Sequence, residues 1–351
     1  MRILVTGGAG FIGSQIVDLL IDDGHEVRVL DVLLESAHNG VPEYLNPAAR
    51  FIRADVGDPL AVREALADVD AVCHQAAKVG LGLDLSDAAD YVRHNDLGTA
   101  VLLQQLAARR FAGRLVLASS MVVYGEGRYI CAAHGDVAPG PRRIEDLDAG
   151  SFEPGCPTCG AALEPASIDE RGALDPRNVY AATKVHQEHL CFAFARETGA
   201  SVIALRYHNV YGPRMPRDTP YAGVASIFAS SLAAGRAPRV FEDGGQLRDF
   251  VHVRDVARAN LLALAAPDAA AGAYNVASGT PRSVLQLATA LVDAHGDDAP
   301  DPVVTGQYRL GDVRHVFASA RRARDELGFA AGEDFAAGVA QFARSPLRAP
   351  A

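Results

Sequence analysis

The chain has 351 residues and a formal net charge of −10, a size that predicts about two domains or one large α/β unit and a charge that argues against a general nucleic-acid-binding protein. No apolar run approaches the ~18 residues of a membrane span, and the N-terminus enters a predicted strand directly, without the apolar core of a secretory signal. Five cysteines, an odd number, suit a reducing compartment, so we expect a cytoplasmic protein without membrane partners.

The first thirty residues predict a dinucleotide-binding unit. A buried strand at residues 2–6 leads into a glycine loop, a helix at 14–22 and a second strand at 26–30 that ends at Asp31. Glycines let a pyrophosphate approach the backbone at a helix N-terminus, and an acidic residue about twenty positions on binds the adenosine ribose and repels a 2′-phosphate, which favours NAD over NADP. The expected cofactor contacts here are Gly7, Gly10, Phe11, Ile12, Gly13 and Asp31.

Strands at 51–56, 71–77 and 115–120 continue the alternation with helices and predict a parallel, doubly wound Rossmann sheet. Ligands bind at the carboxyl ends of such strands. We therefore expect Asp55 and Val56 to contact the adenine, and Ala76, Ala77 and Ser119 to lie against the cofactor.

The basic residues are divided unevenly, because 31 of the 33 are Arg and only Lys78 and Lys184 are Lys. Lys184 follows Tyr180 at i, i+4 in a predicted helix over 178–196, so the two side chains share one helix face. A neighbouring ammonium is expected to lower the pKa of the phenol and make Tyr180 a general base. Ser119 and Ser120, at a strand end on the cofactor edge, support this interpretation. Lys78 follows Ala77 and is expected to reach the pyrophosphate or the substrate.

Six motifs then give the chain its family resemblance. They are Thr6-Gly-Gly-Ala-Gly-Phe-Ile-Gly13, His74-Gln-Ala-Ala77, Ser119-Ser-Met-Val-Val-Tyr-Gly125, Tyr180-x-x-x-Lys184, Arg206-Tyr-His-Asn-Val-Tyr-Gly-Pro213 and Arg248-Asp-Phe-Val-His-Val-Arg-Asp255. With them the chain resembles the extended short-chain dehydrogenase/reductases that act as nucleotide-sugar epimerases, dehydratases and decarboxylases. The resemblance implies further cofactor contacts from Lys78, Asn95, Tyr180, Lys184 and Tyr207. It also implies that Ser120 is the catalytic Ser or Thr of the family, beside Tyr180 and Lys184.

The residues after Ser120 distinguish between the reactions of this family. The 4,6-dehydratases place Asp-Glu there, and the decarboxylases carry a Glu, whereas this chain has Met121 and Val122, which transfer no proton. Tyr, Lys, Ser and NAD are the equipment for C4 epimerisation through a 4-keto intermediate. The resemblance thus implies an NAD-dependent nucleotide-sugar 4-epimerase similar to the dTDP-L-rhamnose 4-epimerases, with uridine-diphosphate sugars equally compatible.

A smaller α/β domain is expected to bind the substrate. By resemblance it comprises residues 209–248 and 278–351, while 1–208 and 249–277 form the NAD-binding domain. Two guanidinium groups can bind a diphosphate bidentately. The implied substrate contacts are Ser120, Met121, Tyr180, Asn209, Arg248, Arg309 and Asp312. His208 stands where the family usually has Phe beside the nicotinamide.

An insertion at residues 126–173 interrupts the first domain. It carries Cys131-Ala-Ala-His134 and, after 21 residues, Cys156-Pro-Thr-Cys159, a spacing that matches a tetrahedral structural zinc site. The segment is rich in Pro, Gly and charged residues, so we expect it to need such a metal site to become ordered. A redox pair and unliganded thiols are the alternatives.

Two other functions stay open from the sequence alone. One is an NAD(P)H-dependent 4-ketosugar reductase, which releases its oxidised cofactor. The other is an inactive dinucleotide-sensing or scaffold protein that uses the insertion to bind partners. Helices near 99–110 and 178–196 resemble the dimer bundle of the family, so we also expect a homodimer.

Overall fold

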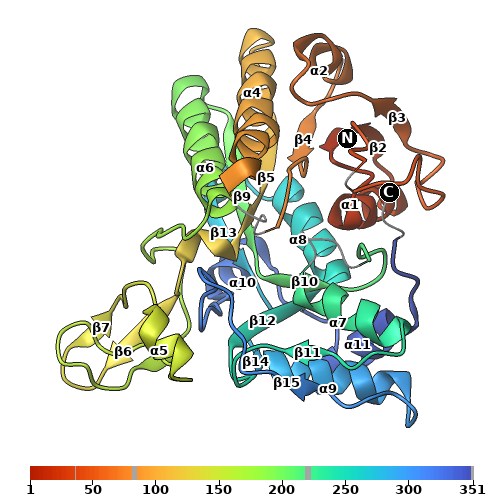
Figure 1. The fold of residues 1–351 in the computed structure, drawn as a ribbon. Coiled ribbons are helices and arrows are strands. Elements are labelled where there is room, and N and C mark those ends of the chain that lie inside the picture. Colours follow the sequence, from red (N-terminus) through yellow and green to blue (C-terminus); the bar gives the residue numbers. More distant parts are fainter. Residues whose placement is uncertain (36, 81–84, 218–222, 349–351) are drawn as a thin grey trace.

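The computed structural model describes residues 1–35, 37–80, 85–217 and 223–348, and its centre is a parallel sheet of seven strands. The strand order is β13-β9-β5-β4-β1-β2-β3 (Figure 1). This confirms the predicted doubly wound α/β fold. The strands are β1 (Arg2–Thr6), β2 (Glu26–Asp31), β3 (Arg50–Arg53), β4 (Ala71–His74), β5 (Arg114–Ser120), β9 (Ser201–Tyr207) and β13 (Gly272–Val276).

Helices cover both faces of the sheet. Successive strand residues point to opposite faces, so Ile3 and Val5 pack against one helix layer and Leu4 against the other. The first layer contains α1 (Phe11–Asp22), α8 (Val253–Ala265) and α10 (Arg321–Leu327). The second contains α2 (Pro59–Ala65), α4 (Gly98–Ala108) and α6 (Val179–Thr198), and the short α3 (Ala88–Tyr91) precedes α4. In the described part of the chain, no helix has the length and apolar character required to cross a bilayer.

A second core lies below the carboxyl ends of the strands (Figure 1). The strand β12 spans residues 247–252 and joins β10 and β14 in one small sheet, although the predicted domain boundary fell inside it. The elements around this second core are β10 (Asn209–Tyr211), α7 (Val224–Ala233), β11 (Arg239–Val240), β12 (Leu247–His252), β14 (Pro281–Ser283), α9 (Val284–His295), β15 (Val303–Val304) and α11 (Phe335–Arg344). We call this part the substrate half.

The insertion forms a separate lobe beside the substrate half (yellow in Figure 1). A three-stranded sheet in the order β7-β6-β8 carries it. Its elements are β6 (Arg128–Cys131), β7 (Gly135–Val137), α5 (Ile144–Asp148) and β8 (Glu164–Ala166). The chain returns to the main body where Ile168 forms a bridge with Ala318.

Candidate active site

A cavity of about 1130 Å³ runs along the carboxyl ends of the central strands. It extends from Asp31 at the end of β2, past Ser120 at the end of β5, to Arg309 in the substrate half. This is the place where a doubly wound sheet binds its ligands. The cavity is large enough for a dinucleotide and a second ligand side by side. A single small metabolite would not need this volume.

The glycine loop forms a cradle at the N-terminus of α1. Gly7 has φ +68°, and a Cβ there would lie 2.6 Å from the backbone nitrogen of Ala76. A Cβ on Gly13 would lie 2.2 Å from the carbonyl oxygen of Gly7. Gly10 begins the helix without a side-chain cap, so the first-turn N–H groups face the cavity without a side-chain acceptor. Backbone donors at a helix N-terminus suit a pyrophosphate.

Asp31 provides a polar contact at the far end of the cavity. Its carboxylate accepts one hydrogen bond from the backbone N–H of Ala9, at 3.0 Å, and one from that of Leu33, at 2.9 Å. Each carboxylate oxygen keeps acceptor capacity for a ribose diol. Asp55 and Val56 line the next stretch. These groups therefore fit the adenosine part of NAD, and His38, buried beside Asp31, was missed from the sequence.

The predicted reactive residues converge in the middle of the cavity. Helix α6 begins at Asn178, whose side chain caps it by accepting from the N–H of Ala181, and this directs Tyr180 and Lys184 toward the end of β5. A hydrogen bond joins the side chains of Tyr180 and Ser120. Lys184 lies with its ammonium 5.9 Å from the Tyr180 ring centroid. Hydroxyl, phenol and ammonium thus share one site.

The prediction that Lys184 lowers the pKa of Tyr180 is wrong for this arrangement. Burial raises the pKa of Tyr180 to about 12, and only the hydrogen bond with Ser120 opposes that shift. The ammonium of Lys184 is directed to the carbonyl oxygen of Ala118 instead, at 2.9 Å. Burial also lowers the pKa of Lys184 to about 8. Desolvation therefore outweighs the charge pairing on which the sequence argument relied.

A buried polar network fixes the strand end beneath these groups. The Ser119 hydroxyl donates to Glu188 of α6, and Glu188 forms a bidentate ion pair with Arg206 of β9, at 2.7 and 2.9 Å. Arg206 donates in turn to the Tyr124 hydroxyl, at 2.8 Å. Both charged side chains are almost fully buried. These contacts hold β5, α6 and β9 in fixed positions relative to one another. The sequence did not predict this network.

Two predicted cofactor contacts face elsewhere. The ammonium of Lys78 lies 3.2 Å from Asp90 and 3.7 Å from Asp87, and Lys78 does not line the described cavity. The Asn95 side chain is buried and bonds both backbone groups of Lys78, so it holds the loop after β4 rather than a ligand. A cation beside two carboxylates finds better compensation there than in the cavity. The other predicted cofactor residues, Tyr207 included, do line it.

The substrate half contributes an amide and several arginines. The Oδ1 atom of Asn209 is buried without a hydrogen-bond partner among the described residues, as expected for a group that awaits a ligand. Arg248 lines the cavity, yet its guanidinium donates to the carbonyl oxygens of Leu247, Val313 and Arg314. Arg309 is exposed over the Phe241 ring, 5.1 Å from its centroid. The remaining predicted substrate contacts, Met121 and Asp312, also line the cavity.

Other cations around the cavity had no sequence signal. They come from two loops, from β11 and from the end of the described chain, and are Arg177, Arg236, Arg239 and Arg348. Arg348 pairs through its backbone with Met215 and Arg217. Such positions lack a motif, because only the fold brings them to the cavity. Together with Arg309 they give an acidic protein a locally cationic pocket that suits a polyanionic ligand.

The insertion brings its predicted metal ligands together. The ligand atoms of Cys131, His134, Cys156 and Cys159 all lie within 4.8 Å of one another. Cys131 Sγ is 3.4 Å from the Nδ1 atom of His134 and 3.8 Å from Cys159 Sγ. Backbone N–H groups of Cys159 and Thr158 lower the pKa of the Cys156 thiol to about 6. Three thiol sulfurs and one imidazole nitrogen around one point are a ligand set that suits tetrahedral zinc.

Fold and site define a dinucleotide-binding enzyme with a Ser–Tyr–Lys centre and a second ligand subsite. The NAD dependent epimerase/dehydratase family model matches residues 3–277, and the chain belongs to that family.

Individual relatives carry different activities. The chain is 34% identical over 333 residues to the dTDP-L-rhamnose 4-epimerase of Burkholderia thailandensis, covering 93% of this chain and 90% of the relative. It is 30% identical over 352 residues to the dTDP-glucose 4,6-dehydratase of Streptomyces antibioticus, covering 97% and 91%. The structure of the UDP-glucose 4-epimerase of Thermus thermophilus in complex with NAD superposes with a TM-score of 0.78 at 30% identity and 98% coverage of both chains.

Proposed function

We propose that this protein is an NAD-dependent nucleotide-sugar 4-epimerase. The observation that carries the proposal is the joint placement of Ser120, Tyr180 and Lys184 in one cavity with the glycine cradle and Asn209. The relatives include both an epimerase and a dehydratase, so the choice rests on the residues of this chain. Met121 and Val122 line the cavity beside Ser120, and neither can transfer the protons that elimination of water requires.

The mechanism follows from the positions of the three side chains. The glycine cradle and Asp31 would hold NAD, which would supply hydride transfer to and from C4 of the sugar and a positive charge that favours the ionised form of Tyr180. Tyr180 accepts the proton of the 4-hydroxyl, and Ser120 shares that hydrogen bond. Lys184 holds positive charge at the strand end while the phenol is ionised. The same tyrosine returns the proton when the sugar, turned over as the 4-keto form, is reduced.

The diphosphate of the substrate is proposed to lie between Arg309 and the other cations of the substrate half. Arg309 is exposed and lies over Phe241, so its guanidinium is accessible to a ligand. Arg248 is proposed to act mainly by fixing the cavity wall, since backbone carbonyls take three of its five N–H donors. This distribution supports a nucleoside-diphosphate sugar as the class of substrate, with dTDP- and UDP-hexoses as the first candidates.

The test is turnover of a panel of dTDP- and UDP-sugars, followed by NMR at C4, with wild type and Tyr180→Phe. Wild type should interconvert C4 epimers without added NADH and keep NAD through purification. Tyr180→Phe should lose turnover by at least about a hundredfold while it retains NAD. Consumption of one NADH per sugar would instead identify a 4-ketosugar reductase, and tight NAD binding without any turnover would identify a silent sensor.

We also propose that Cys131, His134, Cys156 and Cys159 bind one structural zinc ion. Four protein ligands leave no open position for chemistry. The remaining cysteines, Cys73 and Cys191, are buried, and burial raises the pKa of each thiol to about 12. Metal analysis of protein purified without chelator should find about one zinc per chain. Less than about 0.2 zinc per chain, or retention of zinc by Cys156→Ser/Cys159→Ser, would contradict this site.

A homodimer built from α4 and α6 is proposed as the working form. Figure 1 shows these two helices side by side at one edge of the molecule. Leu97, which directly precedes α4, is 53% exposed, and a large apolar side chain there gains by contact with a second copy. We also propose a cytoplasmic location, which the five free cysteines support. Light scattering of the wild type and of Leu97→Glu tests the dimer.

A further inference from the structure

We propose that the insertion is a buttress that sets the substrate-binding wall of the active site. The wall is the segment 309–316, whose residues Arg309, Asp312 and Val313 line the cavity. The inference rests on the proposed function for the identity of the substrate. The geometry that carries it is a set of contacts between the lobe and this segment, buried at Arg142, Glu126 and Tyr129 and more exposed at the outer edge.

The first contact is made by Arg142 of the lobe. Its side chain is only 5% exposed, and it donates to the carbonyl oxygen of Asp312 at 2.7 Å. The same guanidinium pairs with Glu242, at 2.8 Å, and lies 3.8 Å from Glu126. The guanidinium cannot move without cost, because the loss of any of these contacts would leave a buried charge without compensation. Arg142 therefore fixes the backbone of the wall at Asp312.

The second contact occupies the backbone donors of the wall. Glu126, where the insertion begins, accepts from the N–H of Arg314 at 2.7 Å, and the hydroxyl of Tyr129 accepts from that of His315 at 3.2 Å. Both acceptors are buried. Buried backbone donors need partners, and here the lobe supplies two of them. The backbone of the wall can therefore keep this path only while β6 and the residues just before it keep their positions.

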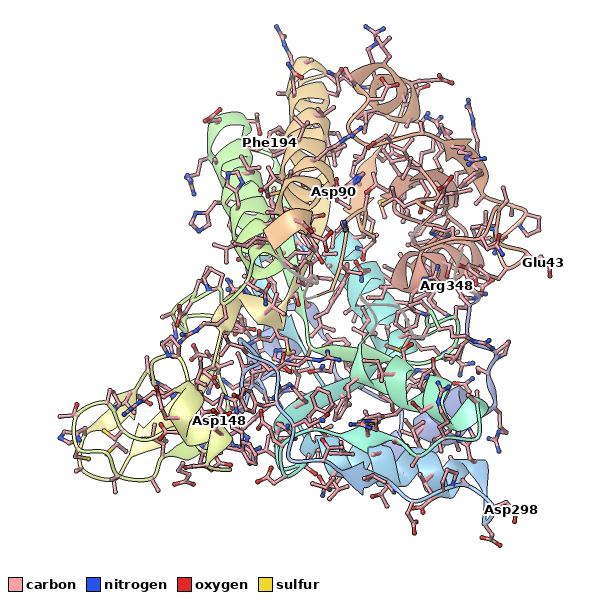
Figure 2. The ribbon with its side chains drawn as sticks, viewed as in Figure 1. Glu43, Asp90, Asp148, Phe194, Asp298 and Arg348 are labelled. Atoms are coloured by element: carbon pink, nitrogen blue, oxygen red, sulfur yellow. The ribbon has the colours of Figure 1, made fainter. Side chains whose placement is uncertain are left out.

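The third contact is through side chains at the outer edge. Glu153 of the lobe accepts from Arg314 at 2.6 Å and is paired with His315 Nε2 at 2.9 Å. The Tyr308 hydroxyl, next to Arg309, donates to Asp148 at 2.6 Å. Figure 2 labels Asp148 on the lobe, adjoining the substrate half. The lobe thus holds the wall along its length.

Arg248 of the substrate half holds the same segment. It donates to the carbonyl oxygens of Val313 and Arg314, while Arg142 donates to that of Asp312. Three consecutive carbonyl groups are therefore fixed by two arginines, one from the lobe and one from the substrate half. Loss of binding that is shared by the ground state and the transition state raises KM and leaves kcat unchanged. Because Arg309, Asp312 and Val313 of this wall line the cavity, the lobe is expected to control substrate affinity. It contributes no group to the reaction at Tyr180.

The experiment compares Arg142→Met with Arg142→Lys and with the control Arg143→Met in full-length, zinc-loaded protein. Arg143 is the next residue, but its side chain is 72% exposed and pairs only with the equally exposed Glu145 among the described residues. Arg142→Met should raise KM for the nucleotide sugar about tenfold or more, with kcat within about twofold and unchanged bound NAD and zinc. Arg142→Lys should restore part of the affinity, and Arg143→Met should match wild type.

An unchanged KM in folded, zinc-loaded Arg142→Met would overturn the proposal, as would a fall in kcat at constant KM. If that variant does not fold, Glu153→Gln serves instead, because Glu153 lies at the exposed edge of the network. Hydrogen exchange gives a readout independent of activity. Amides of residues 312–316 should exchange faster in the variant, and equal exchange would count against a buttress. A wild type that turns over no nucleotide sugar would refute the proposed function, while the exchange experiment would still test the buttress.

Discussion

The ammonium of Lys184 donates a 2.9 Å hydrogen bond to the carbonyl oxygen of Ala118, two residues before Ser120 on the same strand. Lysine and helix α6 are thereby tied to the strand end that presents the reactive hydroxyl. The ammonium is buried, and burial lowers its pKa from 10.5 to about 8. A compact charge on a thin stem fits this position, whereas a planar guanidinium does not.

The buried Lys184 should be visible in the pH dependence of stability. Between pH 8 and 10.5 the unfolded chain binds a proton at this residue that the folded chain releases, so stability should rise with pH in that window. The shift corresponds to about 3 kcal/mol, since each pKa unit is worth about 1.4 kcal/mol. Urea denaturation at pH 7.5 and 9.5 should show a gain of up to about 2 kcal/mol in wild type that Lys184→Met lacks. Parallel behaviour of both proteins would contradict this.

His208 should make the fold sensitive to acid. Its imidazole is buried, and burial lowers its pKa from 6.5 to about 4, with Asp249 acting in the opposite direction. Below pH 6.5 the unfolded chain takes up a proton that the folded chain refuses, so stability should fall as the pH drops toward 4. His208→Phe should remove up to about 3 kcal/mol of that loss.

The same variant tests the packing around His208 at neutral pH. Asn275 is the one side chain among the described residues that hydrogen-bonds the imidazole, which leaves a buried ring nitrogen without a partner, so Phe should raise stability at pH 7 by about 1 kcal/mol. Thermal melts at pH 4.5 and 7 measure both effects. A variant less stable than wild type at both pH values would show that the imidazole is well paired.

The glycine cradle should tolerate no added methyl group. Gly7→Ala meets the backbone of Ala76, so NAD affinity should fall at least about tenfold and stability should fall by more than about 2 kcal/mol. Gly24→Ala is the matched control, because Gly24 also has a positive φ, of 81°, but open space around its Cβ position. That control should lose only about 1 kcal/mol and keep its NAD affinity. Equal losses would mean that backbone strain, not crowding, sets the requirement.

The Glu188–Arg206 pair should be costly to break on one side only. Both side chains are almost fully buried, and their bidentate contact also holds Ser119. Glu188→Gln should destabilise the protein by about 3–5 kcal/mol, because it leaves the guanidinium uncompensated. The double variant Glu188→Leu/Arg206→Met should recover part of that loss. Chemical denaturation of this double variant and of its two single variants, Glu188→Leu and Arg206→Met, measures the coupling, and additive losses would contradict it.

Much of the fold could be predicted because its signals are local. The glycine loop, the strand before it and Asp31 lie within thirty residues, and their spacing determines one supersecondary unit. The Tyr180 and Lys184 pair is likewise a helical spacing, and the Cys-x₂-Cys pattern of the insertion is a turn geometry. Each of these depends on neighbours in the sequence.

Other features of the site depend on contacts that form only in the folded chain. The orientation of Lys78 depends on Asp87 and Asp90, which lie on a different element. The high pKa of Tyr180 comes from burial, which spacing does not report. Arg248 resembles a diphosphate ligand in its motif, yet the wall that it holds approaches from more than sixty residues away.

The ion network between the lobe and the wall limits how this insertion can be moved between proteins. Removing the lobe alone would take Glu153 from Arg314 and Arg142 from Glu242, and the two side chains that remain are each about 2% exposed. These two side chains stay paired with each other at 2.8 Å, so a shortened variant keeps one ion pair of the network, and a graft onto a compact homologue must carry Glu242 and Arg314 with it. The lobe and the wall depend on each other, so their residues should be exchanged together or left in place.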